Sequence, residues 1–132
     1  MSELALTDLG HEPKWRTFTE PVGGFSWSVS PGEWTVLGYR PDGEVVDLTS
    51  VRAMFRLTGT DGSRLLAKIC ALDLDNDKFT NGSAARTLVA GVATELVRDD
   101  QDGVTSYLIL PSRSFGRYMR ETILDAGGEF GL

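Results

Sequence analysis

Residues 86–110 read RTLVAGVATELVRDDQDGVTSYLIL, and this stretch decides the fold class. The segments 86–97 and 104–110 are rich in the β-branched and aliphatic residues that favour strands. The DDQDG sequence between them is typical of a tight turn, because Asp and Gly tolerate the backbone conformations that turns require. We therefore expect two antiparallel strands joined by this turn.

Short alternating segments precede this pair. Apolar and polar residues alternate around Trp15, Trp27 and Trp34, and the sequences PVGG and SPGE interrupt them. The same alternation returns in 44–48 and 51–57, so this part of the chain is predicted to form hairpin strands. Residues 1–14 have no clear period and are expected to form a loose arm, which leaves 15–132 as a single domain.

Two helices complete the predicted architecture. Thr60 is suited to cap the first, because its hydroxyl can accept a hydrogen bond from an unpaired amide. The apolar face of this helix would consist of Leu65, Leu66, Ile69 and Cys70. A second helix is expected after Pro111, with an apolar face of Phe115, Tyr118, Met119, Ile123 and Ala126. The predicted class is α+β, an antiparallel sheet with two main helices on one face.

Composition excludes several classes of function. The formal charge of -6 comes from 19 acidic and 13 basic side chains spread along the chain, so no basic face is available for nucleic acid. No apolar run approaches the roughly 20 residues of a membrane span, and the N-terminus lacks the pattern of a signal peptide. A cytoplasmic protein without nucleic-acid or membrane partners is expected. Cys70 and His11 are each the single residue of their type, so no disulfide or multi-ligand Cys or His metal site is expected.

Motifs for nucleophilic catalysis and nucleotide binding are missing. The sequence contains no G-x-S-x-G turn, no P-loop and no G-x-G-x-x-G. The acidic segment 73–79, DLDNDKF, lacks the Gly and the closing Glu of an EF-hand loop, so it is interpreted as a solvated loop. Cys70 is expected to pack in the core as a small apolar residue.

A series of short motifs resembles the gamma subunit of multi-subunit sarcosine oxidases. In chain order they are Pro31-Gly32-Glu33-Trp34, Asp47, Gly59, Asp73-Leu74, Gly82, Arg86-Thr87-Leu88, Arg113-Ser114-Phe115, Asp125-Ala126 and Glu129-Phe130-Gly131. Each motif alone is weak, but their order over about two-thirds of the chain is reasonably specific. The tryptophans that this family carries in its last helix are absent from 118–123, which puts the usual docking surface in doubt.

The resemblance implies both a fold and a role. The family is related to the folate-binding domain of the glycine-cleavage aminomethyltransferases, so the same α+β fold is implied. In the related oxidases, flavin and NAD are carried only by larger subunits. The implied role is a small non-catalytic subunit that stabilises the larger subunits of a tetrahydrofolate-linked, flavin-dependent oxidase of sarcosine or other N-methyl amines. The residues expected at the interface are Trp27, Trp34, Phe115 and Tyr118.

A second hypothesis concerns Glu95. Residues 91–96, GVATEL, resemble a G-V-I-D-D-L strand of the aminomethyltransferases whose acidic pair includes a residue essential for one-carbon transfer, and Glu95 falls on that pair. This resemblance implies a free-standing folate-dependent transferase or demethylase that self-associates as a homo-oligomer, with Glu95 as its catalytic residue. The implied folate-binding residues are Arg86, Glu95 and Arg113.

The strand pattern bears on the environment of Glu95. Because Ala93, Glu95 and Val97 share one strand face, a partly sheltered carboxylate is one interpretation; a solvent-exposed strand glutamate is the favoured one. A third hypothesis, a structural interaction module that has lost both ligand and partner, also remains open.

Overall fold

The computed structural model describes residues 51–75 and 77–132, together with the strands Ala5–Asp8, Trp15–Phe18, Ser26–Ser30, Glu33–Leu37 and Val46–Asp47. Side chains are described for residues 5, 6, 51–75 and 77–132.

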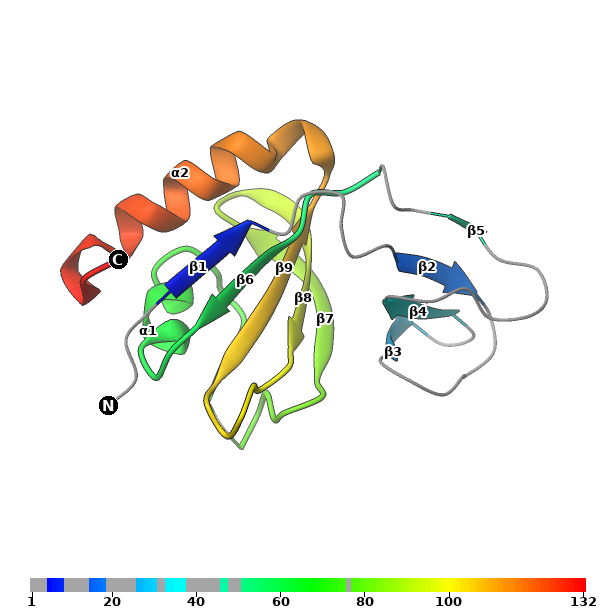
Figure 1. Cartoon of the computed structure of the whole chain (residues 1–132), viewed down its shortest axis with the longest axis horizontal. Helices are drawn as coiled ribbons and strands as arrows, with labels where there is room; N and C mark the ends of the chain where they lie inside the picture. Colours follow the sequence, from blue (N-terminus) through cyan, green and yellow to red (C-terminus); the bar gives the residue numbers. More distant parts are fainter. Residues whose placement is uncertain are drawn as a thin grey trace.

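Five antiparallel strands form the main sheet, in the order β1-β6-β9-β8-β7 (Figure 1). Their bounds are β1 Ala5–Asp8, β6 Phe55–Thr58, β7 Ala84–Val89, β8 Val92–Arg98 and β9 Ser106–Pro111. The central strand β9 is buried at every position, because other residues cover both of its faces. This burial explains why its sequence SYLILP is almost continuously apolar.

Two tight turns connect the last three strands. Ala90 and Gly91, with φ of 53° and 78°, join β7 to β8; Asp102 and Gly103, with φ of 52° and 77°, lie between β8 and β9. Two successive residues with positive φ are the type I′ geometry, whose twist matches that of an antiparallel hairpin. The predicted pairing on either side of DDQDG is confirmed. The segment 86–97, however, is not one strand, because the chain reverses at Ala90 and its two halves pair with each other.

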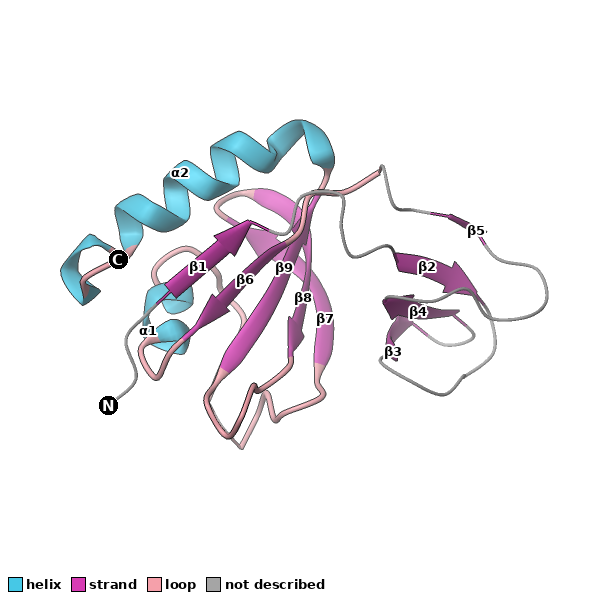
Figure 2. Cartoon of the chain, viewed as in Figure 1, coloured by secondary structure: helices cyan, strands magenta, loops and turns pink. Residues whose placement is uncertain are grey.

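Two helices, α1 (Gly62–Ala67) and α2 (Gly116–Ala126), cover one face of the main sheet, and the predicted α+β class is confirmed (Figure 2). Short 3-10 turns flank α2 at Arg113–Phe115 (η1) and Gly128–Phe130 (η2). The apolar side chains of the two α-helices pack against the sheet in one core. Its main members are Phe55, Leu57, Leu65, Leu66, Leu96, Tyr107, Ile109, Met119 and Ile123.

The details of α1 correct the sequence prediction. Asp61 rather than Thr60 occupies the N-cap position, and it makes no side-chain capping bond. The helix ends at Ala67, so the prediction that Ile69 and Cys70 extend it is wrong. The chain leaves the helix because the Ile69 carbonyl accepts a 2.7 Å hydrogen bond from the Ala90 amide. The expected burial of Cys70 in the core is confirmed.

Four strands form a second antiparallel sheet in the order β3-β4-β2-β5. Their bounds are β2 Trp15–Phe18, β3 Ser26–Ser30, β4 Glu33–Leu37 and β5 Val46–Asp47, which confirms the predicted hairpin strands. In the register, Trp34 lies opposite Phe18 and Trp27 lies opposite Thr35. The side chains of Trp27 and Trp34 lie outside the described residues, so their role at an interface stays a prediction.

Strand β1 corrects the expectation of a loose arm for 1–14. Ala5–Asp8 pairs along the outer edge of β6, and Leu6 packs against the core opposite Leu57. An arm containing a paired strand is not loose over these residues. The division of the chain at residue 15 stays a prediction.

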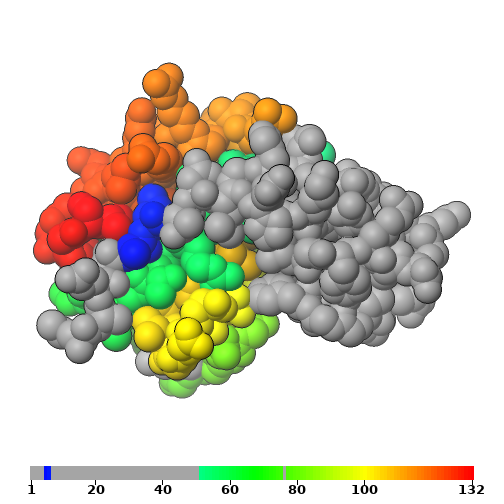
Figure 3. Space-filling view, in the orientation of Figure 1, coloured from blue at the N-terminus to red at the C-terminus, as the bar shows by residue number. Residues whose placement is uncertain are grey.

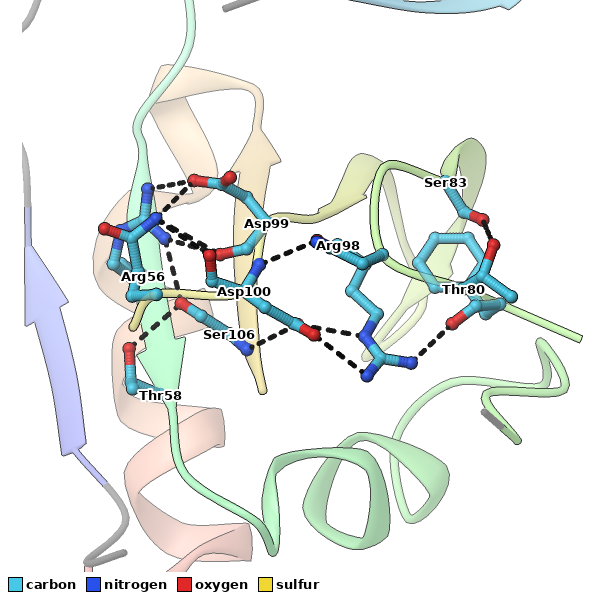
Figure 4. Close-up of polar contacts among 11 residues, drawn as sticks. Arg56, Thr58, Thr80, Ser83, Arg98, Asp99, Asp100 and Ser106 are labelled. Carbon is cyan, nitrogen blue, oxygen red and sulfur yellow. Dashed lines mark hydrogen bonds and ion pairs between the residues drawn. The ribbon is translucent and has the colours of Figure 1, made fainter. Parts of the chain in front are cut away.

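Polar contacts organise the end of the main sheet near the DDQDG turn (Figure 4). Arg98 donates two hydrogen bonds to the Asp100 carboxylate, at 3.0 and 3.1 Å, and a third to the Phe79 carbonyl at 2.9 Å. Arg56 similarly contacts Asp99 at 2.8 Å and the Ser106 hydroxyl at 2.9 Å. The acidic residues of this turn therefore serve as structural partners of the buried Arg98 and the partly buried Arg56.

The acidic segment 73–79 is a solvated loop, as predicted. Asp73, Asp75 and Asp77 are exposed, whereas Leu74 and Phe79 anchor the loop in the core. Within the described ranges, no group of three or more His, Cys, Asp or Glu side chains is placed to hold a metal ion. No described helix is long and apolar enough to span a bilayer.

Candidate binding cavity around Glu95

A cavity of about 560 Å³ lies against strands β7 and β8. The described residues of its wall include Val51, Arg52, Arg86, Leu88, Glu95 and Ser112. Arg86, Leu88 and Glu95 alternate along the strands with core residues such as Val89 and Leu96, so they project from the sheet face opposite the helices. The cavity therefore lies on the other side of the sheet from the main core.

The carboxylate of Glu95 is buried and paired. Glu95 is only 2% exposed, and its Oε2 accepts a 2.7 Å hydrogen bond from Nη1 of Arg52. Nε of Arg86 lies 3.7 Å from the same oxygen. A buried carboxylate is costly unless positive charge and hydrogen bonds compensate it, and the two arginines supply both. The favoured interpretation of an exposed strand glutamate is therefore wrong, and the alternative of a sheltered carboxylate is confirmed.

Strand register explains how the two arginines reach Glu95. Arg86 is directly opposite Glu95 in the β7–β8 pair. Arg52 lies just before β6 and forms an isolated β-bridge with Ser112. It therefore approaches Glu95 from the side of β9, whereas Arg86 approaches from β7. Glu95 is paired with Leu110 of β9, so the Arg52 side chain must extend diagonally across β9. Glu95 is thus held from both flanking directions.

Of the three residues implied for folate binding, the structure brings together Glu95 and Arg86. Arg86 lines the cavity and its side chain is half exposed, at 51%. Arg113 is exposed on η1, next to Ser112, and is not among the described residues of the wall. Its backbone amide donates a 3.0 Å hydrogen bond to the Val51 carbonyl. The role of each residue in binding stays a prediction.

Sequence reasoning missed Arg52. The alternation of VRAMFRL places Arg52 on the strand face opposite Phe55 and Leu57, which indicates a charged residue outside the core. Its partner could not be named, because Glu95 is two strands away in the order β6-β9-β8 and pattern alone does not give strand order.

Four large apolar side chains are exposed among the described residues. They are Val51, Leu88, Phe115 and Tyr118, which are 51%, 60%, 46% and 48% exposed. Val51 and Leu88 line the cavity itself. Tyr118 reaches the turn after β7, because its hydroxyl donates a 2.9 Å hydrogen bond to the Ala90 carbonyl. Phe115 follows Arg113, whose amide binds Val51.

The position of Phe115 and Tyr118 differs from the expected apolar helix face. Met119, Ile123 and Ala126 of α2 face the core, whereas Phe115 and Tyr118 remain at the surface. The difference follows from helix geometry, because Tyr118 is rotated about 100° from Met119 around the helix axis. Their predicted place at an interface is not tested by this exposure.

Two curated relatives match the sequence. The chain is 34% identical over 94 residues to sarcosine oxidase subunit gamma of Corynebacterium sp. strain U-96 and to that of strain P-1. The match covers 71% of this chain and 44% of each relative. Over these 94 residues the chain is similar to sarcosine oxidase gamma subunits. The resemblance carried by the ordered motifs is thereby confirmed, although no family model matches the chain.

The chain also has a structural neighbour. A chain of the heterotetrameric sarcosine oxidase from Corynebacterium sp. U-96, in complex with pyrrole 2-carboxylate, superposes with a TM-score of 0.81 at 19% identity. The superposition covers 98% of this chain and 86% of that chain. At this identity the likeness shows the fold. The chain spans less than half the length of the curated relatives that it matches, at 44%.

Proposed function

We propose that this chain is a small gamma-type subunit without a catalytic centre of its own. It would stabilise the larger subunits of a cytoplasmic, tetrahydrofolate-linked, flavin-dependent oxidase that acts on sarcosine or another N-methyl amine. Flavin and NAD would be carried by those partner subunits. The observation that supports this role is the 34% identity to sarcosine oxidase gamma subunits over 94 residues.

The surface of the chain is consistent with a subunit. Exposed apolar side chains gathered in one place mark association sites in soluble proteins. Burying them against a partner stabilises a complex by about 25 cal/mol for each Å² of apolar surface removed from water. Leu88, Phe115 and Tyr118 are exposed apolar side chains of this kind, and Tyr118 contacts the turn that follows β7.

Co-expression with the larger oxidase chains of the source organism tests the proposal. The expected result is one complex that contains this chain and bound flavin and has a native mass far above 14.4 kDa. Native mass spectrometry of the purified material measures it. Elution of this chain alone, while the larger chains form an active oxidase without it, would contradict the role.

A second candidate function is supported by the buried carboxylate of Glu95. This function is folate-dependent one-carbon transfer by a self-associating chain with Glu95 as the charged group. A volume of about 560 Å³ falls in the range of small-molecule sites, roughly 300–1,000 Å³. Glu95 could accept hydrogen bonds from a pterin ring, and Arg86 could pair with a ligand carboxylate.

Calorimetric titration of the isolated chain with tetrahydrofolate distinguishes the two functions. Binding that Glu95→Gln abolishes and Glu121→Gln leaves unchanged would support the second candidate, since Glu121 is an exposed carboxylate on α2. A homo-oligomer with the same activity in wild type and in Glu95→Gln would exclude it.

A further inference from the structure

We propose that α1 is a lid over a second cavity, beside Cys70, and that η2 is the strap that holds this lid closed. The strap consists of Glu129 and Phe130 of η2. It meets α1 at Arg64 and Lys68. When the strap detaches, α1 leaves the sheet while the sheet stays folded. This inference does not depend on the proposed subunit role.

The second cavity has a volume of about 520 Å³ and lies beside α1. Ser63, Arg64 and Ala67 of the helix line one side of it, and residues 70–75 line the rest. Cys70 borders the cavity but is only 7% exposed. It stays with the sheet through its isolated β-bridge to Val89. A movement of α1 therefore widens the cavity and exposes the thiol.

The helix α1 depends on its surroundings for its position. It has only six residues, and its N-cap makes no side-chain hydrogen bond. Isolated helices shorter than about 12 residues are marginal in water, so tertiary contacts must hold α1 in place. Leu65 and Leu66 supply such contacts on the inner face, where both side chains are fully buried. The strap supplies them on the outer face.

Two cations of α1 hold the strap. Nζ of Lys68 donates a 2.8 Å hydrogen bond to the Ala126 carbonyl at the end of α2, and it also pairs with the Glu129 carboxylate. Arg64 and Lys68 lie over the Phe130 ring, at 5.1 and 5.6 Å from its centroid. Both distances are within the range of about 6 Å for cation–π contacts. The spacing of four positions places both cations on one face of the helix.

The strap is attached to α2 and to the core. The Phe130 amide donates a 2.9 Å hydrogen bond to the Gly127 carbonyl, and Phe130 and Leu132 pack against the core. The hydrogen bond and the charge of Lys68 lower the pKa of Glu129, so this carboxylate is ionised at neutral pH. Figure 3 shows η2, in red, at the surface of the molecule, where Glu129 is exposed. The strap can therefore detach directly into solvent.

Alkylation of Cys70 by N-ethylmaleimide measures how often the lid opens. Cys70 is the single cysteine of the chain, so the intact mass reports its labelling alone. Phe130→Ala removes both cation–π contacts and part of the core packing. We expect it to raise the labelling rate at least about tenfold, because labelling follows the open population when closing is fast. The matched control, Phe115→Ala, truncates an exposed aromatic residue on η1 and should leave the rate unchanged.

A second pair of variants tests the ion pair alone. Glu129→Gln removes the charge that pairs with Lys68 and should raise the labelling rate, by less than Phe130→Ala does. Its control, Glu121→Gln, removes an exposed charge that pairs with Arg117 and should leave the rate unchanged. Thermal unfolding checks that every variant folds. If Phe130→Ala does not fold, the Glu129 and Glu121 variants decide the question.

Hydrogen exchange of the same proteins distinguishes a lid from general loosening. A helix of six residues loses its hydrogen bonds when it leaves the sheet, so we expect the Leu65 and Lys68 amides to exchange faster in the strap variants. The Leu108 amide of β9 should keep its wild-type rate. Equal acceleration in α1 and β9 would overturn the inference, and so would wild-type labelling of Cys70 in the strap variants. Either result leaves the subunit role intact, because co-expression tests that role separately.

Discussion

The guanidinium of Arg52 and the carboxylate of Glu95 meet at 2.7 Å although 43 positions separate them in the chain. The contact joins the segment before β6 to β8 across the intervening strand β9. Both residues line the cavity, so this ion pair joins two parts of the cavity wall. Removing the pair should change the free energy of unfolding as well as ligand binding.

Arg52→Met should lower the free energy of unfolding by about 2–4 kcal/mol, because the carboxylate of Glu95 would stay buried without its shortest-range partner. Urea denaturation measures the change. The control is Arg117→Met, which removes an exposed 3.6 Å pair with Glu121. That loss should cost less than about 0.5 kcal/mol. Equal effects of the two substitutions would show that the Arg52–Glu95 pair is not structurally important.

Gly127→Ala should destabilise the C-terminal end of the protein by about 1–3 kcal/mol through overpacking. A methyl group at this position would lie 2.5 Å from Cδ2 of Leu132 and 2.9 Å from Cδ1 of Leu65. Gly128 is the matched control, since a methyl group there would contact no atom within 4 Å. Thermal unfolding of both variants checks the prediction, and an equal melting temperature would contradict it.

Ala90→Gly should stabilise the β7–β8 hairpin by about 0.5–1 kcal/mol. Ala90 has a φ of 53°, in the left-handed region where an L-residue with a Cβ is strained. Glycine relieves this strain, although it also increases the entropy of the unfolded chain. The converse change, Gly91→Ala at φ 78°, should destabilise. Chemical denaturation of the pair gives the two signs, and the prediction fails if both substitutions destabilise.

Tyr107→Phe should raise stability by about 1 kcal/mol at neutral pH, because an unpaired buried hydroxyl is lost. Tyr107 is fully buried, and its hydroxyl has no hydrogen-bond partner among the described residues. Burial raises the pKa of Tyr107, and the nearby Arg98 guanidinium partly opposes this effect. Asp100 raises this pKa further, and the Ser63 hydroxyl lowers it slightly although its geometry falls outside that of a hydrogen bond.

The raised pKa of Tyr107 also predicts a pH dependence. Above about pH 10 the unfolded chain releases the phenolic proton while the folded protein retains it, so the free energy of unfolding falls as pH rises through this window. Below about pH 10 both states keep the proton, and this contribution to stability is fully present. Tyr107→Phe should show a shallower alkaline decline than wild type in denaturation curves; parallel declines would contradict the assignment.

Sequence patterns predicted those elements whose local signals are strong. The DDQDG turn was predictable because Asp102-Gly103 is a strong type I′ signal. The turn at Ala90-Gly91 has the same geometry and was missed, because alanine is unfavourable at positive φ and does not indicate a turn. The pairing of β7 with β8 determines that turn, and this pairing cannot be deduced from the local sequence.

The candidate site shows the same division. The resemblance of GVATEL to a functional strand singled out Glu95, but the favoured interpretation of an exposed glutamate was wrong, because strand alternation alone does not show which face is covered. Arg52 could not be connected to it, because their contact depends on the strand order. The exposed position of Phe115 was missed because η1 interrupts the helical period before α2 begins.

Strand β1 has a consequence for handling the protein. Its four residues occupy the outer edge of β6, whose other edge is paired with β9. Clipping or fusing the chain before Asp8 would uncover the amide and carbonyl groups of β6, and an uncovered strand edge recruits other copies into aggregates. The N-terminal residues should therefore be kept intact in recombinant material, since turbidity from a shortened chain would reflect the lost strand rather than a missing partner.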